Sequence, residues 1–501
     1  MNSTSPIPSP SEPPPLLKLT AFERFQYWET RPGFPNQIVA VLDFTGPLDA
    51  TLFVEAVARV LPRHPLLYSR IKSVGHEPVA FVWSEGRPNL EAIAAPANSA
   101  RNTVTNPLDR LDALGLQDYV RMQPQPEGWQ PQQLANLPDV QPEHGPAFCL
   151  TIQFNRTHSR WIMQTHHVVC DGLGGLQSIR ELLQVYHWLS SDPQKPFPLR
   201  PLQMERLRNR GRLMRGATTL WGRLARLPMK WMGLFGASKF LWRRPVSLSA
   251  GNHVHRSASS GNGSPETMTI SPEIAWVDGR LTVSQTKRLR QIAKESGVTL
   301  NSLLLAHWLT TLHRFRCQND SSSEGARDCY RLMIPTNERS GGDVALSACN
   351  QVSMVYVDRW PREMEHVEGL AAGIDFEMSV IRRWGLSGTF LLALEVLGWL
   401  PGLIRWHARR PSGWATSYVT NLGPIMDRLR VGQAGLLSQV GPLTLTEIRM
   451  LPPLRPALPA ALAVHFYGGQ FCLTLHHDPR EIPAEKAAEL IRMLLNRLRT
   501  Q

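Results

Sequence analysis

The sequence predicts an α/β protein of two lobes, and three observations lead to this expectation. A chain of 501 residues exceeds what one hydrophobic core usually serves. Apolar stretches with strand-like and helix-like spacing alternate in both halves of the chain. A basic stretch that ends in a Gly-, Ser- and Asn-rich cluster separates the halves. We therefore expect a disordered Pro- and Ser-rich start at 1–16, an N-terminal lobe at 17–195, a crossover at 196–265 and a C-terminal lobe at 266–501.

In the N-terminal lobe, strand and helix patterns follow each other along the chain. In order, we expect a strand, an amphipathic helix, a hairpin and a second helix at 36–46, 49–65, 147–168 and 173–191. Pro65 stops the first helix, and the hairpin turns around Arg156 to Arg160.

The C-terminal lobe repeats this style. We expect a strand at 268–283, helices at 284–297 and 300–315, and strands at 330–337 and 350–360. A strand pair at 461–479 and a terminal helix at 483–499 follow. Ser284 caps the first of these helices and Gly297 ends it, while the strand pair turns at Gly468 and Gly469.

One apolar run, residues 388–406, is long enough to raise the question of a membrane span. It contains Glu395 and Pro401, which a bilayer-spanning helix disfavours. We therefore expect a buried helix or the wall of a substrate tunnel.

The cysteines and the start of the chain indicate the compartment. The six cysteines form no CxxC pair, which fits neither a zinc site nor a disulfide scaffold. The first 16 residues lack the basic region and apolar core of a signal peptide. We expect a cytoplasmic protein that binds no metal.

The formal net charge of +13 predicts attraction to an anionic partner. Residues 205–244 hold eleven Lys or Arg and one acid, Glu205, with aromatic and aliphatic residues spaced among them. Such a segment can lie on an anionic membrane surface, or pack as an amphipathic helix across the two lobes, or attract the phosphates of coenzyme A. No nucleic-acid-binding module accompanies the charge, so we expect no nucleic acid partner.

Two adjacent histidines, His166 and His167, end an apolar strand and precede Asp171 and Gly172. Successive side chains of a strand point to opposite faces, so only one of the two rings can face a given cavity. His167 lies closer to the loop, in which Gly172 permits a tight turn and Asp171 can reach a partner. We expect His167 to act as a general base and His166 to pack in the core. A second doublet, His476 and His477, lacks the spaced Asp-Gly and is interpreted as structural.

The stretch "HHVVCDG" at 166–172 resembles the HHxxxDG signature of the condensation-domain and chloramphenicol acetyltransferase-like acyltransferases. This superfamily includes wax ester synthases, alcohol acetyltransferases and polyketide-associated acyltransferases. The stretches "LTAFERFQYWE", "RHPLLYSRI", "IPTNERSG", "NQVSMVYVDR", "TSYVTNLGP" and "FCLTLHHDPR" occur in the order that the superfamily shows. The resemblance covers nearly the whole chain except the Pro-rich start and the basic crossover.

The resemblance implies two chloramphenicol acetyltransferase-like α/β sandwich lobes that form a V around a central tunnel. It implies that His167 is the base at the centre of the tunnel, and that Asp171 pairs with an arginine, for which Arg339 is the candidate. Arg339 can also be read as a plain surface arginine. Asn350 follows Cys349 where the superfamily has a glycine, and it is a further substrate-binding candidate.

Ser417, Thr420 and Asn421 lie in "TSYVTNLGP" and offer hydroxyl and amide groups to a substrate carbonyl. Asn421 can equally shape a turn. Cys170 lies three residues from His167 and is a conceivable nucleophile, but the sequence shows nothing that would lower its pKa.

The expected function is acyl transfer from a coenzyme A or carrier-protein thioester to a hydroxyl group. A thioester is already activated, so positioning, one base and oxyanion donors suffice, with no bound cofactor. We expect a free-standing enzyme of lipid or secondary metabolism, with the acyl thioester, a small alcohol or amine and, for some donors, an acyl carrier protein as partners. Amide formation of the non-ribosomal peptide type and a catalytically silent binding or scaffold module are the alternatives.

Overall fold

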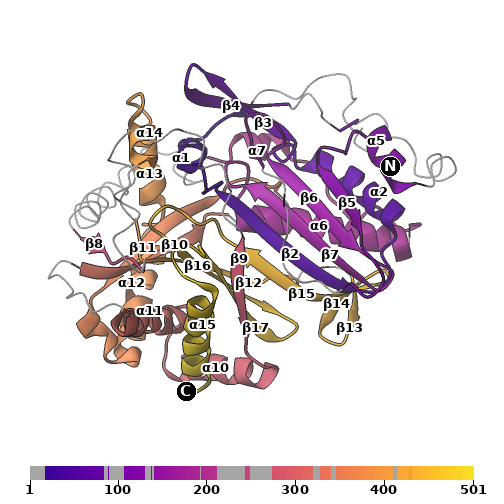
Figure 1. Cartoon of the computed structure of the whole chain (residues 1–501). Coiled ribbons are helices and arrows are strands. Elements are labelled where there is room, and N and C mark those ends of the chain that lie inside the picture. Colours follow the sequence, from indigo (N-terminus) through magenta and orange to yellow (C-terminus); the bar gives the residue numbers. More distant parts are fainter. Residues whose placement is uncertain are drawn as a thin grey trace, which may run out of the picture.

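A computed structural model gives the fold (Figure 1). It describes residues 17–83, 88–89, 106–129, 137, 140–191, 193–211, 243–248, 274–319, 328–339, 346–409, 414–427, 429 and 431–500. The expected disordered start at 1–16 lies outside these residues, as does most of the expected crossover.

The first lobe is built on a seven-stranded sheet of order β13-β14-β15-β2-β7-β6-β5. Its strands are β2 (Gln37–Thr45), β5 (Val120–Pro124), β6 (Phe148–Phe154), β7 (His158–His166), β13 (Gly432–Ala434), β14 (Leu437–Val440) and β15 (Leu443–Leu451). A small sheet pairs β1 (Leu17–Lys18), β4 (Glu77–Trp83) and β3 (Ser69–Val74) in that order. The helical elements are α1 (Ala21–Glu29), α2 (Ala50–Val60), η1 (Leu61–Arg63), α5 (Pro107–Ala113), α6 (Gly172–Ser191) and α7 (Met204–Arg208).

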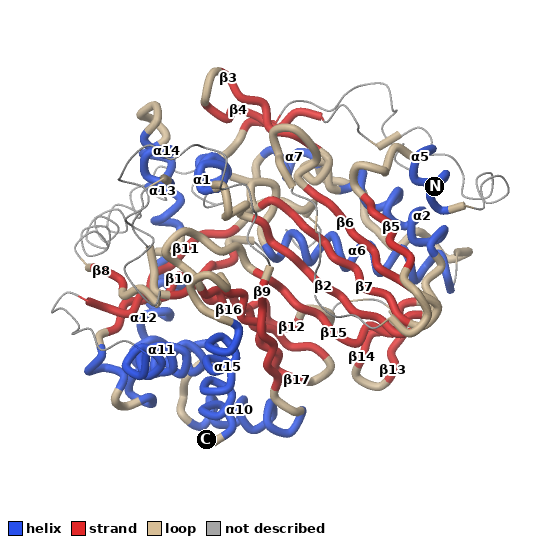
Figure 2. The backbone as a smooth tube through the Cα atoms, viewed as in Figure 1, coloured by secondary structure: helices blue, strands red, loops and turns tan. Residues whose placement is uncertain are grey.

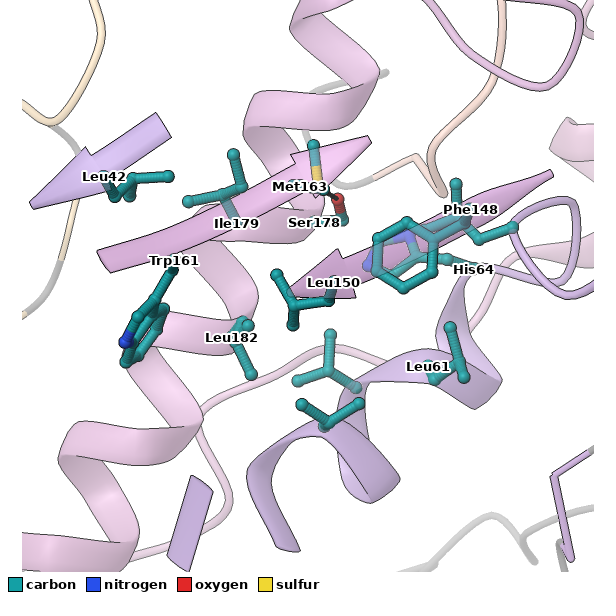
Figure 3. Close-up of a pocket in the computed structure, with 13 residues that line it drawn as sticks. Leu42, Leu61, His64, Phe148, Leu150, Trp161, Met163, Ser178, Ile179 and Leu182 are labelled. Carbon is teal, nitrogen blue, oxygen red and sulfur yellow. Dashed lines mark hydrogen bonds between the residues drawn. The ribbon is translucent and has the colours of Figure 1, made fainter. Parts of the chain in front are cut away.

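Helices α2 and α6 pack on one face of this sheet because each has an apolar stripe at helical spacing. Their side chains meet those of β2, β6 and β7 around a small apolar cavity (Figure 3). Trp161 and Leu150 come from the strands, and Leu182 comes from α6. This cavity is a gap in core packing, lined almost entirely by apolar groups.

The second lobe has a sheet of order β11-β10-β12-β16-β17-β9, and β8 also pairs with β10. Its strands are β8 (Arg244–Pro245), β9 (Ala275–Arg280), β10 (Asp328–Asn337), β11 (Val352–Arg359), β12 (Ser417–Pro424), β16 (Ala460–Tyr467) and β17 (Gln470–His477). Its helical elements are α10 (Val283–Glu295), α11 (Leu300–Asn319), η4 (Pro361–Met364), α12 (Val367–Trp384), α13 (Gly388–Leu397), α14 (Leu403–Ala408) and α15 (Ala484–Arg499). Figure 2 shows α10, α11, α12 and α15 gathered beside this sheet. The expected two-lobed α/β fold is confirmed.

The chain does not stay in the second lobe after residue 266. Strand β15 pairs antiparallel with β2, with Leu451 opposite Val39, and so adds β13, β14 and β15 to the first sheet. These residues were expected in the C-terminal lobe, since an alternating pattern does not say which of two sheets a strand joins. As a result, the end of β15 lies beside the start of β2, which itself pairs with the end of β7.

Helix α10 begins earlier than expected. Its cap is Thr282 and not Ser284: the Thr282 hydroxyl accepts from Gln285 N, and the Gln285 side chain accepts from Thr282 N. This reciprocal arrangement satisfies two N–H groups at once, which favours Thr282 over Ser284.

The apolar run 388–406 forms two short helices, α13 and α14, with a break at residues 398–402. It is only partly the expected buried helix, because Leu394 is buried whereas Trp399 is 79% exposed. In the described part of the chain, no helix is both long enough and apolar enough to cross a bilayer.

Candidate active site

The two histidines of the HHxxxDG stretch lie at the end of β7, at the point where the strand turns into α6. The ring of His166 is held inside the first lobe: its Nδ1 accepts from Val168 N at 3.1 Å, and its Nε2 lies 2.9 Å from Thr30 Oγ1. Because Nδ1 accepts, Nε2 carries the proton and donates to Thr30. Both ring nitrogens of His166 are therefore occupied.

The ring of His167 points the other way. The His167 main chain is fixed from both sides, with its N–H donating to Asn36 O and its carbonyl accepting from Asn350 Nδ2. Its Nδ1 is buried without a hydrogen-bond partner among the described residues. Phe22 meets the ring edge-on, with the ring centroids 6.1 Å apart.

His167 faces a cavity between the two lobes. The first lobe contributes Ile38, Asp171, Gly172, Leu173, Met450, Pro452 and Pro453 to its wall, and the second lobe contributes Pro335, Asn337, Arg339, Val352, Tyr418, Thr420, Asn421 and Leu422. The wall is therefore mostly apolar, with a few hydroxyl, amide and charged groups near the imidazole. Such a site excludes most water while it orients a ligand.

Burial lowers the pKa of His167 to about 4, and the positive charge of Arg455 acts in the same direction. Burial also lowers the pKa of His166, to about 3. A buried imidazole loses the hydration that stabilises its charged form, so both rings are neutral near pH 7. Neutral His167 is thus in the form that accepts a proton.

Asp171 joins the two lobes directly behind this histidine. Its carboxylate accepts from both terminal nitrogens of Arg339, at 2.9 and 3.0 Å. It also accepts from Gly174 N at the start of α6 and from Gln351 N in the second lobe. Arg339 is therefore not a plain surface arginine. The charge-assisted pair fixes the loop that carries His167.

Comparisons with known proteins extend these observations. No family model matches the sequence, and no curated protein matches it. A solved structure of the first condensation domain of the calcium-dependent antibiotic synthetase, in complex with a substrate analogue, is similar over 97% of each chain, with 15% identity and a TM-score of 0.62. A mutant of the starter condensation domain of the rhizomide synthetase RzmA, in complex with C8-CoA, is similar over 97% of this chain and 94% of that chain (14% identity, TM-score 0.59). SgcC5 of Streptomyces globisporus, in complex with (R)-(-)-1-(2-naphthyl)-1,2-ethanediol and sucrose, is similar over 96% of this chain and 98% of that chain (12% identity, TM-score 0.59).

The chain has the condensation-domain fold. The fold that the HHxxxDG resemblance implied is therefore confirmed across nearly the whole length of the chain. Because the sequence identities are low, this similarity establishes the fold and not the function.

Within this condensation-domain fold, Asn350 has a different place from the expected one. Asn350 was predicted to bind substrate, but its Nδ2 donates to the carbonyls of His167 and Val168, at 2.8 and 2.9 Å. Its side chain is buried and does not line the cavity. Asn350 thus holds the main chain of the catalytic candidate from the opposite lobe.

Ser417 is likewise a structural residue. It is fully buried, accepts from the Trp308 indole N–H at 3.1 Å and donates to Ala460 O. Asn421 lines the cavity, but it bonds Asn301 Oδ1 and accepts from Gly423 N, which is the turn-shaping alternative. Thr420 also lines the cavity, and its role as a substrate-binding residue stays a prediction.

Gly172 was expected to permit a tight turn, but its backbone needs no left-handed conformation. The glycine that the loop requires is Gly174, where a Cβ atom would lie 2.9 Å from Cys349 O. This close approach brings α6 against the segment that carries Asn350. Gly172 instead leaves space in the cavity wall.

The cysteines near the site are buried in the first core. Burial raises the pKa of the Cys170 thiol and raises that of Cys349 to about 12, so neither forms the thiolate that a nucleophile requires. Cys349 stands at the position where the sequences that this chain resembles have a glycine; its side chain packs in the core and does not narrow the cavity.

Two residues near the site were not predicted from the sequence. Tyr418 lines the cavity, and burial raises its pKa, so its hydroxyl stays protonated and can donate. Arg455 is buried and pairs with Glu29 at 2.8 Å, and burial raises the pKa of Glu29 to about 7. Tyr418 lies inside the quoted stretch "TSYVTNLGP", which was a usable signal, whereas Arg455 lies outside every quoted motif.

Proposed function

We propose that this protein transfers an acyl group from a coenzyme A or carrier-protein thioester to the hydroxyl group of a hydrophobic alcohol. The observation that carries the proposal is the neutral imidazole of His167, whose buried Nδ1 has no hydrogen-bond partner among the described residues and whose ring lines the cavity between the lobes. A base in this position can reach an acceptor and a thioester carbonyl at the same time.

In the proposed reaction, the cavity-facing Nε2 of His167 removes the proton from the acceptor hydroxyl as its oxygen attacks the thioester carbonyl carbon. The carbonyl oxygen takes up the negative charge of the tetrahedral intermediate. Collapse of this intermediate breaks the carbon–sulfur bond, and the imidazolium returns its proton to the departing thiolate. The products are an ester and a free thiol, with no change in oxidation state.

Two hydroxyl groups of the cavity wall suit the oxyanion. Tyr418 and Thr420 both line the cavity and come from β12, on the side of the second lobe. Hydrogen-bond donors that are already oriented in a water-poor site stabilise developing negative charge strongly. We assign the two hydroxyls to this role.

The structural neighbours support this choice of donor and acceptor. One neighbour was solved with C8-CoA, an acyl thioester, and another with an aryl ethanediol, an alcohol. A further neighbour was solved with C8-CoA and Leu-SNAC, an amino-acid thioester that carries an amine, so amide formation is the second candidate.

The test measures thiol release from acyl-CoA donors of several chain lengths, with and without alcohols and amines. We expect an acceptor-dependent rate for the native chain and a loss of about 100- to 10,000-fold in His167→Ala. The product mass identifies an ester or an amide. Equal rates for the two proteins would rule out the catalytic role of His167, and no turnover with any donor and acceptor would favour the binding module.

A further inference from the structure

The hairpin of α13 and α14 carries an apolar tip on the outside of the molecule. Val396 is 47% exposed, Trp399 79%, Leu400 61% and Trp406 56%. In Figure 1 the hairpin projects beyond the rest of the second lobe, near α1. Four large apolar side chains within eleven residues form an exposed patch, and exposure of such a patch to water is unfavourable.

The base of the hairpin is firmly packed, so the exposed tip is held in a defined position. Leu394 and Ile404 are buried, and Phe390 meets Phe25 edge-on with the ring centroids 5.8 Å apart. Arg31 donates to Ala408 O at 2.8 Å and ties the end of α14 to the chain after α1.

Two arginines lie at the base of the hairpin, below this tip. Arg405 and Arg409 both lie over the ring of Trp28, at 4.8 and 5.1 Å from its centroid. Glu395 is the single acid in residues 388–409. Together with the net charge of +13, these arginines give the apolar tip a positively charged surround.

We infer that this tip docks on an anionic lipid bilayer. The tip is a projection and not a groove, so it suits insertion between lipids better than capture of a peptide segment. Indole rings favour the bilayer interface, and arginines next to them can reach anionic headgroups. This surface is separate from residues 205–244, most of which lie outside the described part of the chain.

The docking surface also lies on an apolar path to the site. Phe390 of α13 contacts Phe22 edge-on at 6.5 Å, and Phe22 contacts the ring of His167 at 6.1 Å. A docked hairpin would therefore place the bilayer on the side from which apolar side chains lead to the imidazole. On this basis, which rests on the proposed function, we assign a bilayer-dissolved long-chain alcohol or acyl donor as the substrate class.

The experiment compares flotation of the full chain with phosphatidylcholine vesicles and with vesicles that also contain phosphatidylglycerol. The test variant is Trp399→Glu with Leu400→Glu, and the matched control is Leu436→Glu. Leu436 is 65% exposed in the turn between β13 and β14, at the other end of the molecule (Figure 1). We expect the native chain and the control to bind the anionic vesicles, and the test variant to bind them at least about tenfold more weakly.

Equal vesicle binding by the test variant and the native chain would overturn the inference, as would no binding by the native chain. Gel filtration tests the alternative that a second copy of the chain covers the tip. A native chain that elutes as a dimer and a test variant that elutes as a monomer would show that this alternative is correct and would overturn the inference. Thiol release from a water-soluble short-chain donor should be unchanged in the test variant, because the tip does not line the cavity. A failure of the proposed function would appear in that assay for the native chain, independently of flotation.

Discussion

The two histidine doublets differ in what their rings contact. Strand β7 ends at His166 and His167 follows it directly, whereas His476 and His477 are the last two residues of β17. All four side chains are buried. Burial lowers the pKa of both His167 and His476 to about 4. Neither burial nor the pKa therefore identifies the catalytic candidate.

Their hydrogen bonds separate the two pairs. Nδ1 of His476 donates to Pro452 O at 2.6 Å, and Nδ1 of His477 donates to Ile482 O at 2.8 Å. His167 instead has a buried Nδ1 with no hydrogen-bond partner among the described residues, and its ring lines the cavity. An imidazole already bound to a main-chain carbonyl is a structural support. An imidazole left unbound at a cavity between lobes is available for chemistry.

The aspartates that follow the doublets provide the strongest test of this contrast. Asp171 pairs with Arg339 across the lobes, whereas Asp478 pairs with Arg480, two residues away, whose side chain is 51% exposed. We expect Asp171→Asn to lower the free energy of unfolding by about 3 kcal/mol, because it leaves Arg339 buried without its counter-charge. The rate should fall as well, since the loop that carries His167 loses its anchor. Chemical denaturation and thiol release measure the two effects.

Asp478→Asn is the control for that experiment. An ion pair with an exposed arginine contributes about 0–1 kcal/mol, so this variant should stay close to the native chain in stability and rate. If the two variants lost stability equally, the cross-lobe pair would have no special role.

A smaller effect is expected at Asn350. Asn350→Ala removes both hydrogen bonds to the carbonyls of His167 and Val168, which should cost about 1–3 kcal/mol of stability. We expect kcat to fall about tenfold with KM little changed, because the base moves while the binding surface stays. Asn155→Ala, which removes two hydrogen bonds to the carbonyls of Pro126 and Trp129 away from the cavity, is the control. If only KM changed, Asn350 would instead contact the substrate, as the sequence predicted.

The pH dependence is expected to be the smallest effect. As the pH falls from 6.5 toward 4, unfolded histidines take up protons while His167 and His476 stay neutral in the folded chain, so stability decreases through this window. The rate per folded molecule should stay flat in the same window and fall only near pH 4, where His167 protonates. Thermal melting and thiol release across this range check both statements. A rate that halves near pH 6.5 would mean that His167 titrates like an exposed imidazole.

The sequence predicted the two-lobed fold, the order of its elements and the opposite directions of His166 and His167. These features follow from periodicity and from a dense local motif. The Asp171–Arg339 pair came only from the resemblance, because its partners lie 168 positions apart. Pairings of this kind have no local signal in a single sequence.

Other features could not be predicted for physical reasons. Strand β15 joins the first sheet because of a long-range pairing with β2, and alternation alone does not choose between two sheets. Asn350 was predicted to bind substrate from the resemblance, and Ser417 because a hydroxyl group suits that role. Their true partners are main-chain carbonyls and, for Ser417, also the Trp308 indole, none of which the sequence marks.

The most direct measurement compares His167→Asn with His476→Asn in single-turnover thiol release at saturating donor and acceptor. Asn places an amide nitrogen near the position of Nδ1, so it can keep the bond from residue 476 to Pro452 O but supplies no base at residue 167. We predict that His167→Asn loses about 100- to 10,000-fold in rate, whereas His476→Asn keeps a rate close to that of the native chain. Similar rates for the two variants would contradict the assignment of His167 as the base.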